Sequence, residues 1–252
     1  MSSRAVILAG GKGSRLSPYT TVLPKPLLPI GDRAILDVVV RQLAGYGFHD
    51  LTLAVGYLSH LIKAVMGDGS EHGVRIEYHE EGEPLGTVGP LATIDGLEDT
   101  FLAMNGDVLT SLDYSHLIDA HRKGGHALTI ASHQRTVHID YGVLRVDDLG
   151  DGETNPIVGF EEKPELPYVV SMGVYAFEPR ALDLVEPGTY SDIPDLVLKL
   201  IDAGESVGSY LFDGYWLDIG RHDDYELAIE QYEELKPMLL KEEPTATTEP
   251  TS

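Results

Sequence analysis

Hydrophobic residues in the first half of the chain alternate between two spacings. Short and mostly apolar runs predict buried strands, and longer stretches with apolar residues three or four positions apart predict amphipathic helices. The predicted strands are 6–9, 51–55, 74–78, 101–104 and 127–132, and the predicted helices are 34–44, 58–66, 114–123 and one beginning within 85–91. Strands separated by helices in this way pair in parallel and are covered by the connecting helices.

The second half of the chain is less regular. Two short strands, 141–146 and 157–161, are predicted to pair around a turn-rich connection, and a short helix is predicted to begin at Pro179. Further strands are predicted at 169–177 and 207–212, and further helices at 193–203 and 225–235. The whole pattern predicts an α/β fold with a Rossmann-like, mixed but mainly parallel sheet flanked by helices.

One folded domain is predicted over residues 1–236, followed by a tail at 237–252 that is rich in proline, threonine and glutamate. From residue 242 onward the chain consists of Glu, Pro, Thr, Ala and Ser. Such a segment cannot bury enough apolar area to offset the entropy of ordering it. We therefore expect the tail to be disordered.

The formal net charge of −23 is the strongest feature of the composition. It argues against nucleic acid or an anionic membrane as a partner, and it requires local cations wherever an anionic substrate binds. The chain has no cysteine, no apolar run of membrane-spanning length and no signal-peptide pattern, so we expect a cytoplasmic protein. The composition leaves open whether the chain forms a homo-oligomer.

A glycine-rich loop follows the first predicted strand, with the sequence GGKGSRL at residues 10–16. Glycines let backbone N–H groups approach a bound anion closely, and amides in such a turn suit phosphate. Lys12, Arg15 and Lys25 place three cations beside the loop in a chain that is otherwise strongly acidic. The loop therefore predicts a triphosphate site.

Two better-known phosphate loops do not fit this sequence. A P-loop requires four residues between a glycine and a Gly-Lys-Ser/Thr run, and the chain has no such spacing. A dinucleotide fingerprint would need a third glycine at the position of Leu16. This mismatch, together with the lack of a hydride-transfer constellation, disfavours a dehydrogenase.

The loop is followed by the sequence PKPLLP at residues 24–29. Together the two segments resemble the signature of the sugar-1-phosphate nucleotidylyltransferases, which share the nucleotide-diphospho-sugar transferase fold. The resemblance implies that Arg15 and Lys25 are catalytic and act on the β- and γ-phosphates of a nucleoside triphosphate. The residues that it implies for nucleotide binding are Leu8, Ala9, Gly10, Gly11, Gly13, Glu81, Gly86, Thr87 and Asp107.

Two aspartates from distant parts of the chain are candidate ligands of a magnesium ion. Asp107 follows the buried strand 101–104, and Asp218 lies in the run YWLDIG at 215–220. One or two carboxylates suffice for Mg²⁺ where phosphate oxygens and water complete its coordination. Both positions match the metal-binding aspartates of the resembled family, so the resemblance implies Mg²⁺ as the cofactor.

A third set of residues matches the sugar-phosphate site of the same family. Glu162 and Lys163 belong to the run EEKP at 161–164, and Gly142 follows a tyrosine ahead of a predicted strand. The resemblance implies that Glu162 binds sugar hydroxyls, that the Gly142 amide faces the sugar and that Lys163, a further catalytic residue, aligns the attacking phosphate. Mannose-specific members have asparagine where this chain has Ser171, which favours an unusual hexose, heptose or cyclitol phosphate.

The reaction that the resemblance implies is transfer of a nucleoside monophosphate from a nucleoside triphosphate to a sugar 1-phosphate, with release of pyrophosphate. GTP is the favoured nucleotide, because the loop at 80–91 is most similar to that of the guanylyltransferases for mannose and heptose 1-phosphates. In addition, the Glu81 carboxylate offers an acceptor to guanine N1–H and the 2-amino group. Thymidylyl or uridylyl transfer to a hexose 1-phosphate is an alternative, and so is a catalytically inactive regulatory subunit that binds nucleotide sugars.

Overall fold

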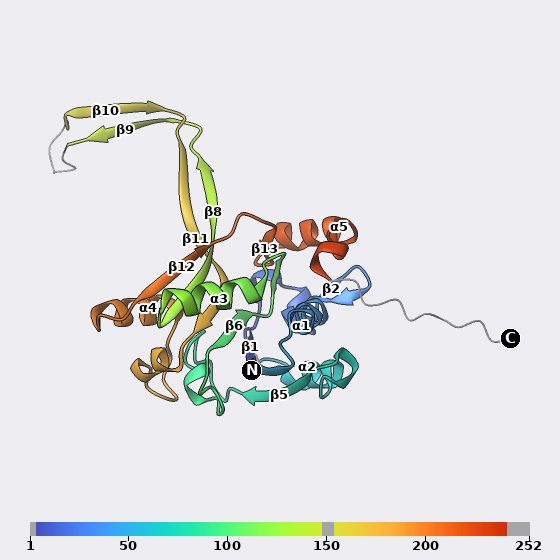
Figure 1. Cartoon of the computed structure of the whole chain (residues 1–252). Helices are drawn as coiled ribbons and strands as arrows, with labels where there is room; N and C mark the ends of the chain where they lie inside the picture. The colour runs from blue at the N-terminus through green and yellow to red at the C-terminus, as the bar shows by residue number, and fades with distance from the viewer. Residues whose placement is uncertain (1–3, 148–153, 241–252) are drawn as a thin grey trace.

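The computed structural model of the chain describes residues 4–147 and 154–240 (Figure 1). Its strands are β1 (Arg4–Ala9), β2 (Pro29–Ile30), β3 (Arg33–Ala34), β4 (Asp50–Val55), β5 (Arg75–Glu80), β6 (Phe101–Asn105), β7 (Val108–Thr110), β8 (Leu128–His138), β9 (Gly142–Val146), β10 (Ile157–Glu162), β11 (Glu165–Phe177), β12 (Val207–Leu211) and β13 (Trp216–Asp218). Its α-helices are α1 (Ile35–Gly45), α2 (Ser59–Met66), α3 (Tyr114–Gly124), α4 (Ile193–Asp202) and α5 (His222–Leu239). The stretch from residue 242 onward, predicted to be disordered, lies outside the described residues.

Seven strands form the central sheet in the order β12-β8-β11-β6-β1-β4-β5. Strand β1 pairs in parallel with both β4 and β6, and β4 pairs in parallel with β5. Strand β11 runs antiparallel to its neighbours β6 and β8, whereas β12 is parallel to β8. The sheet is therefore mainly parallel with one reversed strand, which confirms the predicted α/β architecture.

Helices cover both faces of this sheet, because neighbouring residues of a strand point to opposite sides. Ile7 of β1 belongs to the apolar core that contains Leu36 of α1 and Ile62 of α2. Val6, the residue before it, belongs to the core that contains Leu196 of α4. The inner strands are buried on both faces, which explains why β1 and β4 are almost entirely apolar.

Helix α5 forms a third apolar cluster with segments that follow the glycine-rich loop. Leu16 and Tyr232 are fully buried in this cluster. The helix continues to Leu239, which is also buried there, so residues 237–239 belong to the folded domain and not to the predicted tail. None of the helices in the described ranges is long and apolar enough to cross a membrane.

The helix predicted to begin within 85–91 does not form in the described structure, where this segment consists of turns and one short 3₁₀ helix at Leu91–Thr93. Gly86 has a positive φ of 79°, which an α-helix does not allow. The N–H groups of Val88 and Gly89 donate to the carbonyl of Ser191, at 2.9 and 3.2 Å. The prediction is wrong because hydrogen bonds to a distant segment satisfy the backbone groups that a helix would have paired.

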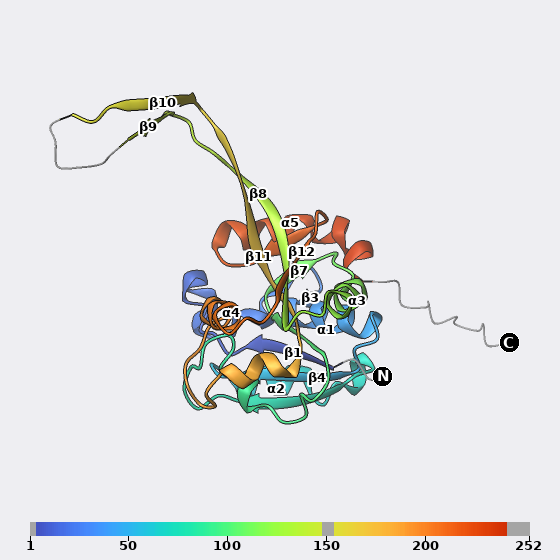
Figure 2. The same ribbon diagram turned by 60° about the vertical axis from the view of Figure 1, so that its left-hand side comes forward.

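Strands β8 and β11 are longer than predicted and extend out of the body as a pair (Figure 2). Their pairing is continuous from Ser171 opposite Ser132 to Glu165 opposite His138. Beyond this ladder, β9 and β10 form a separate two-stranded antiparallel sheet, which confirms the predicted strand pair. We call residues 133–147 and 154–170 the hairpin arm.

Candidate functional site

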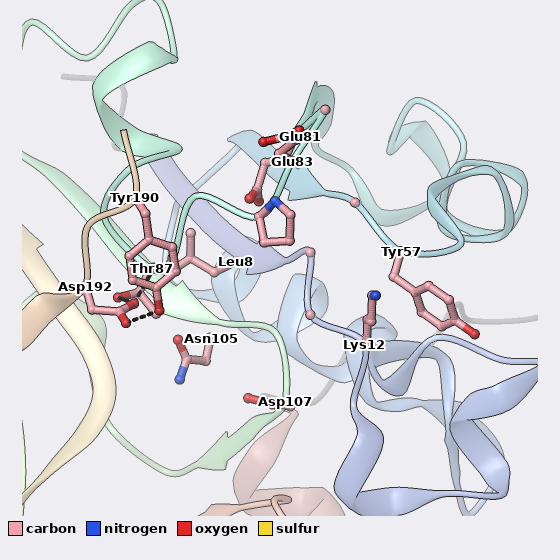
Figure 3. Close-up of a pocket in the computed structure, with 16 residues that line it drawn as sticks. Leu8, Lys12, Tyr57, Glu81, Glu83, Thr87, Asn105, Asp107, Tyr190 and Asp192 are labelled. Atoms are coloured by element: carbon pink, nitrogen blue, oxygen red, sulfur yellow. Dashed lines mark hydrogen bonds between the residues drawn. The ribbon is translucent and has the colours of Figure 1, made fainter. Parts of the chain in front are cut away.

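A cavity of about 720 Å³ lies at the carboxyl ends of β1, β4, β5 and β6. Strand order reverses at β1, whose neighbours are β4 and β6, and such a point is where open α/β sheets bind ligands. Of the residues predicted to bind nucleotide, Leu8, Gly10, Gly11, Glu81, Gly86, Thr87 and Asp107 line the cavity, whereas Ala9 and Gly13 do not (Figure 3). The other lining residues are Lys12, Gly56, Tyr57, Gly82, Glu83, Pro84, Asn105, Tyr190 and Asp192.

Gly13 shapes the glycine-rich loop from behind the cavity. It has a positive φ of 60°, and a Cβ atom there would lie 3.0 Å from Cγ2 of Thr20 and 3.1 Å from Cβ of Lys25. The Gly13 carbonyl accepts hydrogen bonds from the Thr20 hydroxyl at 2.8 Å and from the Leu16 N–H at 2.9 Å. The loop is therefore held against the segment that contains Lys25.

Lys25 and Asp107 form an ion pair at the edge of the cavity. Lys25 is only 8% exposed, and its ammonium group donates to Oδ2 of Asp107. The other carboxylate oxygen, Oδ1 of Asp107, is buried and has no hydrogen-bond partner among the described residues. A buried oxygen without a partner is unfavourable, so Asp107 has an open position for a cation or another donor.

Asp218 lies next to Asp107. Strand β13 pairs with β7 so that Asp218 is opposite Val108, and the Ile219 N–H donates to the Asp107 carbonyl at 3.2 Å. One side of the Asp218 side chain reaches solvent, yet burial by the surrounding protein raises its pKa. The negative charge of Asp107 raises this pKa further, and the positive charge of Lys25 opposes both effects. The site therefore disfavours two negative charges so close together unless a cation lies between them.

This donor set fits a magnesium ion. The repulsion that raises the pKa of Asp218 and the unpartnered Oδ1 of Asp107 are both relieved by a divalent cation bound to the two carboxylates. Residues 4–147 and 154–240 contain no cluster of three or more candidate metal ligands. Two carboxylates are nevertheless enough for Mg²⁺ when phosphate oxygens and water supply the remaining ligands.

Arg15 is exposed and lies near Asp218. Its Nη1 atom is 3.8 Å from the position of a Cβ atom at Gly220, two residues after Asp218. Its charge also lowers the pKa of Asp218, against the effect of burial. The structure therefore gathers Arg15, Lys25, Asp107 and Asp218 from four separate parts of the chain.

Glu81 lies across the cavity from Asp107 (Figure 3). Its Oε1 atom would be 2.6 Å from a Cβ atom at Gly10, so a side chain at Gly10 would displace it. Its Oε2 atom accepts a hydrogen bond from the Leu85 N–H at 3.2 Å. Burial raises the pKa of the Glu81 carboxyl, although that hydrogen bond acts in the opposite direction.

Thr87 holds the cavity wall together through its polar groups. Its N–H and its hydroxyl donate to Oδ1 of Asp192 (Figure 3) at 2.9 and 3.1 Å. The hydroxyl also accepts from the Ile193 N–H at 3.0 Å. Asp192 is the N-cap residue of α4, and its carboxylate binds this loop instead of its own helix. Asp192 and Tyr190, whose hydroxyl donates to Oδ2 of Asp192, are not predicted from the sequence, because the only local signal is that of a helix start.

Gly86→Ala is expected to destabilise the folded protein by about 2–4 kcal/mol. Gly86 has a positive φ, and a Cβ atom there would lie 2.5 Å from the backbone oxygen of Ser191, next to the start of α4. Gly82→Ala is a matched control in the same loop, since the described residues place no atom within 4 Å of its Cβ position. Urea denaturation of both variants measures the difference, and equal stabilities would contradict the expected clash.

Ser171 lies at a bulge in β11, close to the cavity wall. Its hydroxyl donates to the Tyr175 hydroxyl and accepts from the Gly173 N–H, both at 3.3 Å. Gly173 has a φ of 74°, and a Cβ atom there would lie 2.7 Å from Nδ2 of Asn105, which lines the cavity. The structure therefore brings Ser171 near the nucleotide end of the predicted site.

The other predicted sugar-phosphate residues lie in the middle of the hairpin arm, where the β8–β11 ladder meets the β9–β10 sheet. Gly142 and Glu162 are paired in the β9–β10 sheet, and Lys163 follows at the turn into β11 with a φ of 44°. At about 3.3 Å per residue, the strand from Glu165 to Ser171 spans roughly 20 Å. Both views of the molecule show this junction away from the body (Figures 1 and 2).

These observations define a class of site. A glycine-rich loop with adjacent cations, at the switch point of a mainly parallel sheet and beside two aspartates, suits a nucleotide polyphosphate. A family model described as "Nucleotidyl transferase" matches residues 4–234. The chain belongs to this family, as the sequence predicts.

Two relatives show how the chain compares with named enzymes. It is 34% identical over 248 residues to the UTP–glucose-1-phosphate uridylyltransferase of Synechocystis sp., and 33% identical over 227 residues to the mannose-1-phosphate guanylyltransferase of Mycobacterium tuberculosis. These matches cover 90% and 88% of this chain but 62% of each relative, so the chain spans less than two thirds of their length. The solved structure of a candidate glucose-1-phosphate thymidylyltransferase from Bacillus anthracis has the same fold, with a TM-score of 0.71 and 23% identity over 91% of this chain and 94% of that one.

Proposed function

We propose that this protein transfers a nucleoside monophosphate from a nucleoside triphosphate to a sugar 1-phosphate and releases pyrophosphate. The observation that carries the proposal is the ion pair of Lys25 and Asp107, next to Asp218 and Arg15 at the glycine-rich loop. Membership of the nucleotidyl transferase family supports it. The names of two relatives support it as well, since one specifies glucose 1-phosphate and the other mannose 1-phosphate.

In this reaction an oxygen of the sugar phosphate attacks the α-phosphorus of the nucleotide. The bond from that phosphorus to the bridging oxygen breaks, and pyrophosphate leaves with the bridging oxygen and the electron pair. The chain must hold the two reactants in line and neutralise the charge that collects on the leaving group. We assign phosphate binding to the backbone of Gly10 and Gly11, and stabilisation of the leaving pyrophosphate to Arg15 and Lys25.

Asp107 and Asp218 are the residues that would hold Mg²⁺, which when bound neutralises phosphate oxygens of the nucleotide. Lys25 orients the Asp107 carboxylate through Oδ2. This leaves Oδ1, the oxygen without a partner in the described structure, for the cation. The sugar phosphate is assigned to Gly142, Glu162, Lys163 and Ser171, with an unusual hexose, heptose or cyclitol as the sugar.

Guanine is the base that we assign to the cavity, with Glu81 as the residue that selects it. Oε2 of Glu81 binds the loop through Leu85, whereas Oε1 faces the glycine-rich loop near Gly10. Guanine presents the N1–H and 2-amino donors together, which thymine and uracil cannot do. A pyrimidine cannot offer this donor pair to the free Oε1 side of the half-buried carboxylate, at a cost of about 1–3 kcal/mol.

Glu81→Gln is expected to narrow the preference for GTP. Wild type should use GTP at least about tenfold better than UTP or dTTP in kcat/KM, which corresponds to about 1.4 kcal/mol. The amide keeps an acceptor for the Leu85 N–H but loses the charge, so GTP use should fall while the penalty on pyrimidines is relieved. Kinetics with all four nucleotides on both proteins measure the ranking. An unchanged ranking would assign base selection to other groups, and better use of UTP or dTTP by wild type would favour the uridylyl- or thymidylyltransferase alternative.

The GTP preference should also depend on pH. Because burial raises the pKa of Glu81, its carboxylate takes up a proton at a higher pH than an exposed glutamate does. The ratio of kcat/KM for GTP to that for UTP should therefore be at its maximum above this raised pKa, and it should fall as the pH is lowered through it. The ratio in Glu81→Gln should stay flat over the same range, and a parallel fall in both proteins would contradict the assignment.

The experiment that tests the general proposal is pyrophosphate release from each nucleoside triphosphate with a panel of hexose, heptose and cyclitol 1-phosphates. Turnover with any pair supports nucleotidylyl transfer and identifies the sugar. Binding of a nucleotide sugar without turnover of any pair would favour the regulatory-subunit alternative. A cytoplasmic location remains a prediction from the sequence.

A further inference from the structure

Many large apolar side chains of the hairpin arm are exposed. Those at least 49% exposed are Val137, Tyr141, Leu144, Ile157, Val158, Phe160, Tyr168 and Val169. Exposed apolar residues scattered singly are ordinary, whereas a contiguous set on one element indicates a contact surface. All eight belong to one projecting structure (Figure 1), which indicates that the arm contacts another surface.

Both faces of the arm are open. Tyr168 and Val169 are consecutive residues in the regular part of the β8–β11 ladder and are 52% and 60% exposed. Consecutive residues of a strand point to opposite faces, so no layer of the described structure covers either side. The β9–β10 sheet has only two strands, and a hairpin of two strands is marginally stable in water unless something packs on it. We therefore expect another surface to pack on the arm.

The arm also holds groups that the cavity lacks. Among the described residues, four carboxylates line the cavity, from Glu81, Glu83, Asp107 and Asp192, and Lys12 is the only cation in the lining. A doubly anionic sugar phosphate entering this cavity beside a triphosphate needs further positive charge. Lys163, in the run predicted to bind the sugar phosphate, can supply that charge.

The described structure keeps Lys163 away from the cavity of its own chain. The β8–β11 ladder is continuous over the seven pairs from Ser171–Ser132 to Glu165–His138 and holds the arm extended. Its register shift lies between Ser171 and Tyr175, at the body end, so no irregularity inside the ladder would fold the arm back. A second copy of this chain has an acidic cavity that the Lys163 cation can enter, and it has an exposed arm of its own.

We propose that two copies of this chain exchange hairpin arms, so that Glu162 and Lys163 of one copy complete the sugar-phosphate site of the other. A two-fold arrangement is self-complementary and covers both arms at once. The activity test of this arm exchange rests on the proposed nucleotidylyl transfer. The measurement of molar mass in solution rests only on the exposed arm. A cavity completed within one chain, by an arm that bends back at the bulge, is the competing arrangement.

The test combines two inactive variants by co-expression with different affinity tags. Asp107→Asn destroys the cavity of one chain and leaves its arm intact, whereas Lys163→Ala destroys the arm of the other chain and leaves its cavity intact. With random pairing, half of the dimers are mixed, and each mixed dimer has one intact cavity served by one intact arm. Activity should therefore return to about one quarter of the wild-type value per chain. If the doubly purified mixed dimer is as inactive as the single variants while wild type is active, arm exchange is wrong.

Molar mass in solution provides a readout that does not depend on catalysis. Wild type should be a dimer by light scattering, and Val158→Asp/Phe160→Ser should be a folded monomer, since both side chains are exposed within one chain. A monomeric wild type, or a double variant that stays dimeric, would overturn the proposal. If wild type is a dimer through its arm but turns over no substrate pair, nucleotidylyl transfer fails and the arm contact stands.

Discussion

Asp107→Asn is expected to lower the rate of pyrophosphate release by roughly 10³-fold, the upper end of the cost of losing one preorganised charge contact. The amide oxygen can still accept from the Lys25 ammonium, so the fold should survive the substitution. What is lost is the charge on the carboxylate whose Oδ1 has no partner in the described structure, and with it the affinity for a divalent cation. Steady-state kinetics over a magnesium titration measure the effect.

Asp218→Asn should show the same loss of activity with a different effect on stability. Burial and the neighbouring Asp107 raise the pKa of Asp218, which means that the folded protein disfavours its charge. Removing this charge should therefore leave the melting temperature without added metal equal to or above that of wild type, although activity is lost.

Asp202→Asn is the matched control, because it removes an equal charge from the exposed end of α4. It should leave activity, metal response and melting temperature unchanged. Excess chelator should abolish wild-type turnover, and magnesium should restore it. Wild-type rates from Asp107→Asn or Asp218→Asn, or undiminished activity in chelator, would refute the metal assignment.

Lys25→Met is expected to lower kcat/KM by roughly 10²–10³-fold and also to destabilise the protein by about 3 kcal/mol. The activity falls because a cation assigned to the β- and γ-phosphates is removed. The stability falls because Lys25 is almost fully buried and is paired with Asp107, whose carboxylate would then be left without a partner on either oxygen. Breaking one side of a buried ion pair costs more than removing the pair.

The double variant Lys25→Met/Asp107→Asn separates these two effects. It should recover most of the lost stability, to within about 1 kcal/mol of Asp107→Asn alone, and it should remain inactive. Lys199→Met, on the exposed side of α4, is the control for loss of one lysine charge and should change neither property. Equal stability of Lys25→Met and wild type would show that the ion pair does not support the fold.

The order of apolar and polar residues is enough to predict the elements of the sheet body and the glycine-rich loop. Apolar runs at 6–9 and 51–55 have to be buried, and the flanking amphipathic segments have to cover them, so strand order along the chain leads to a mainly parallel sheet. The loop was predictable because glycine is the residue that tolerates a positive φ, as Gly13 has in the structure. Local chemistry was sufficient for both.

Neighbouring strand ends could also be anticipated, but not the contacts between them. Only the family resemblance predicted that Asp107 and Asp218 lie together. In the structure, the β7–β13 register places Asp218 opposite Val108, the residue after Asp107. The ion pair between Asp107 and Lys25 depends on the same packing. No local pattern encodes contacts between residues separated by 82 or more positions, as Lys25 and Asp107 are.

The wall of the cavity and the position of the arm depend on long-range contacts that no local pattern predicts. The segment 85–91 has an apolar spacing that suits a helix, yet bonds to Ser191 and Asp192 hold it in turns. Strands β8 and β11 extend beyond the segments that are buried in the body, because the backbone groups of each strand pair with those of the other. The extended pair places Lys163 away from the body. Short-range preferences amount to fractions of a kcal/mol per residue, so long-range pairing of backbone groups overrides them where it is available.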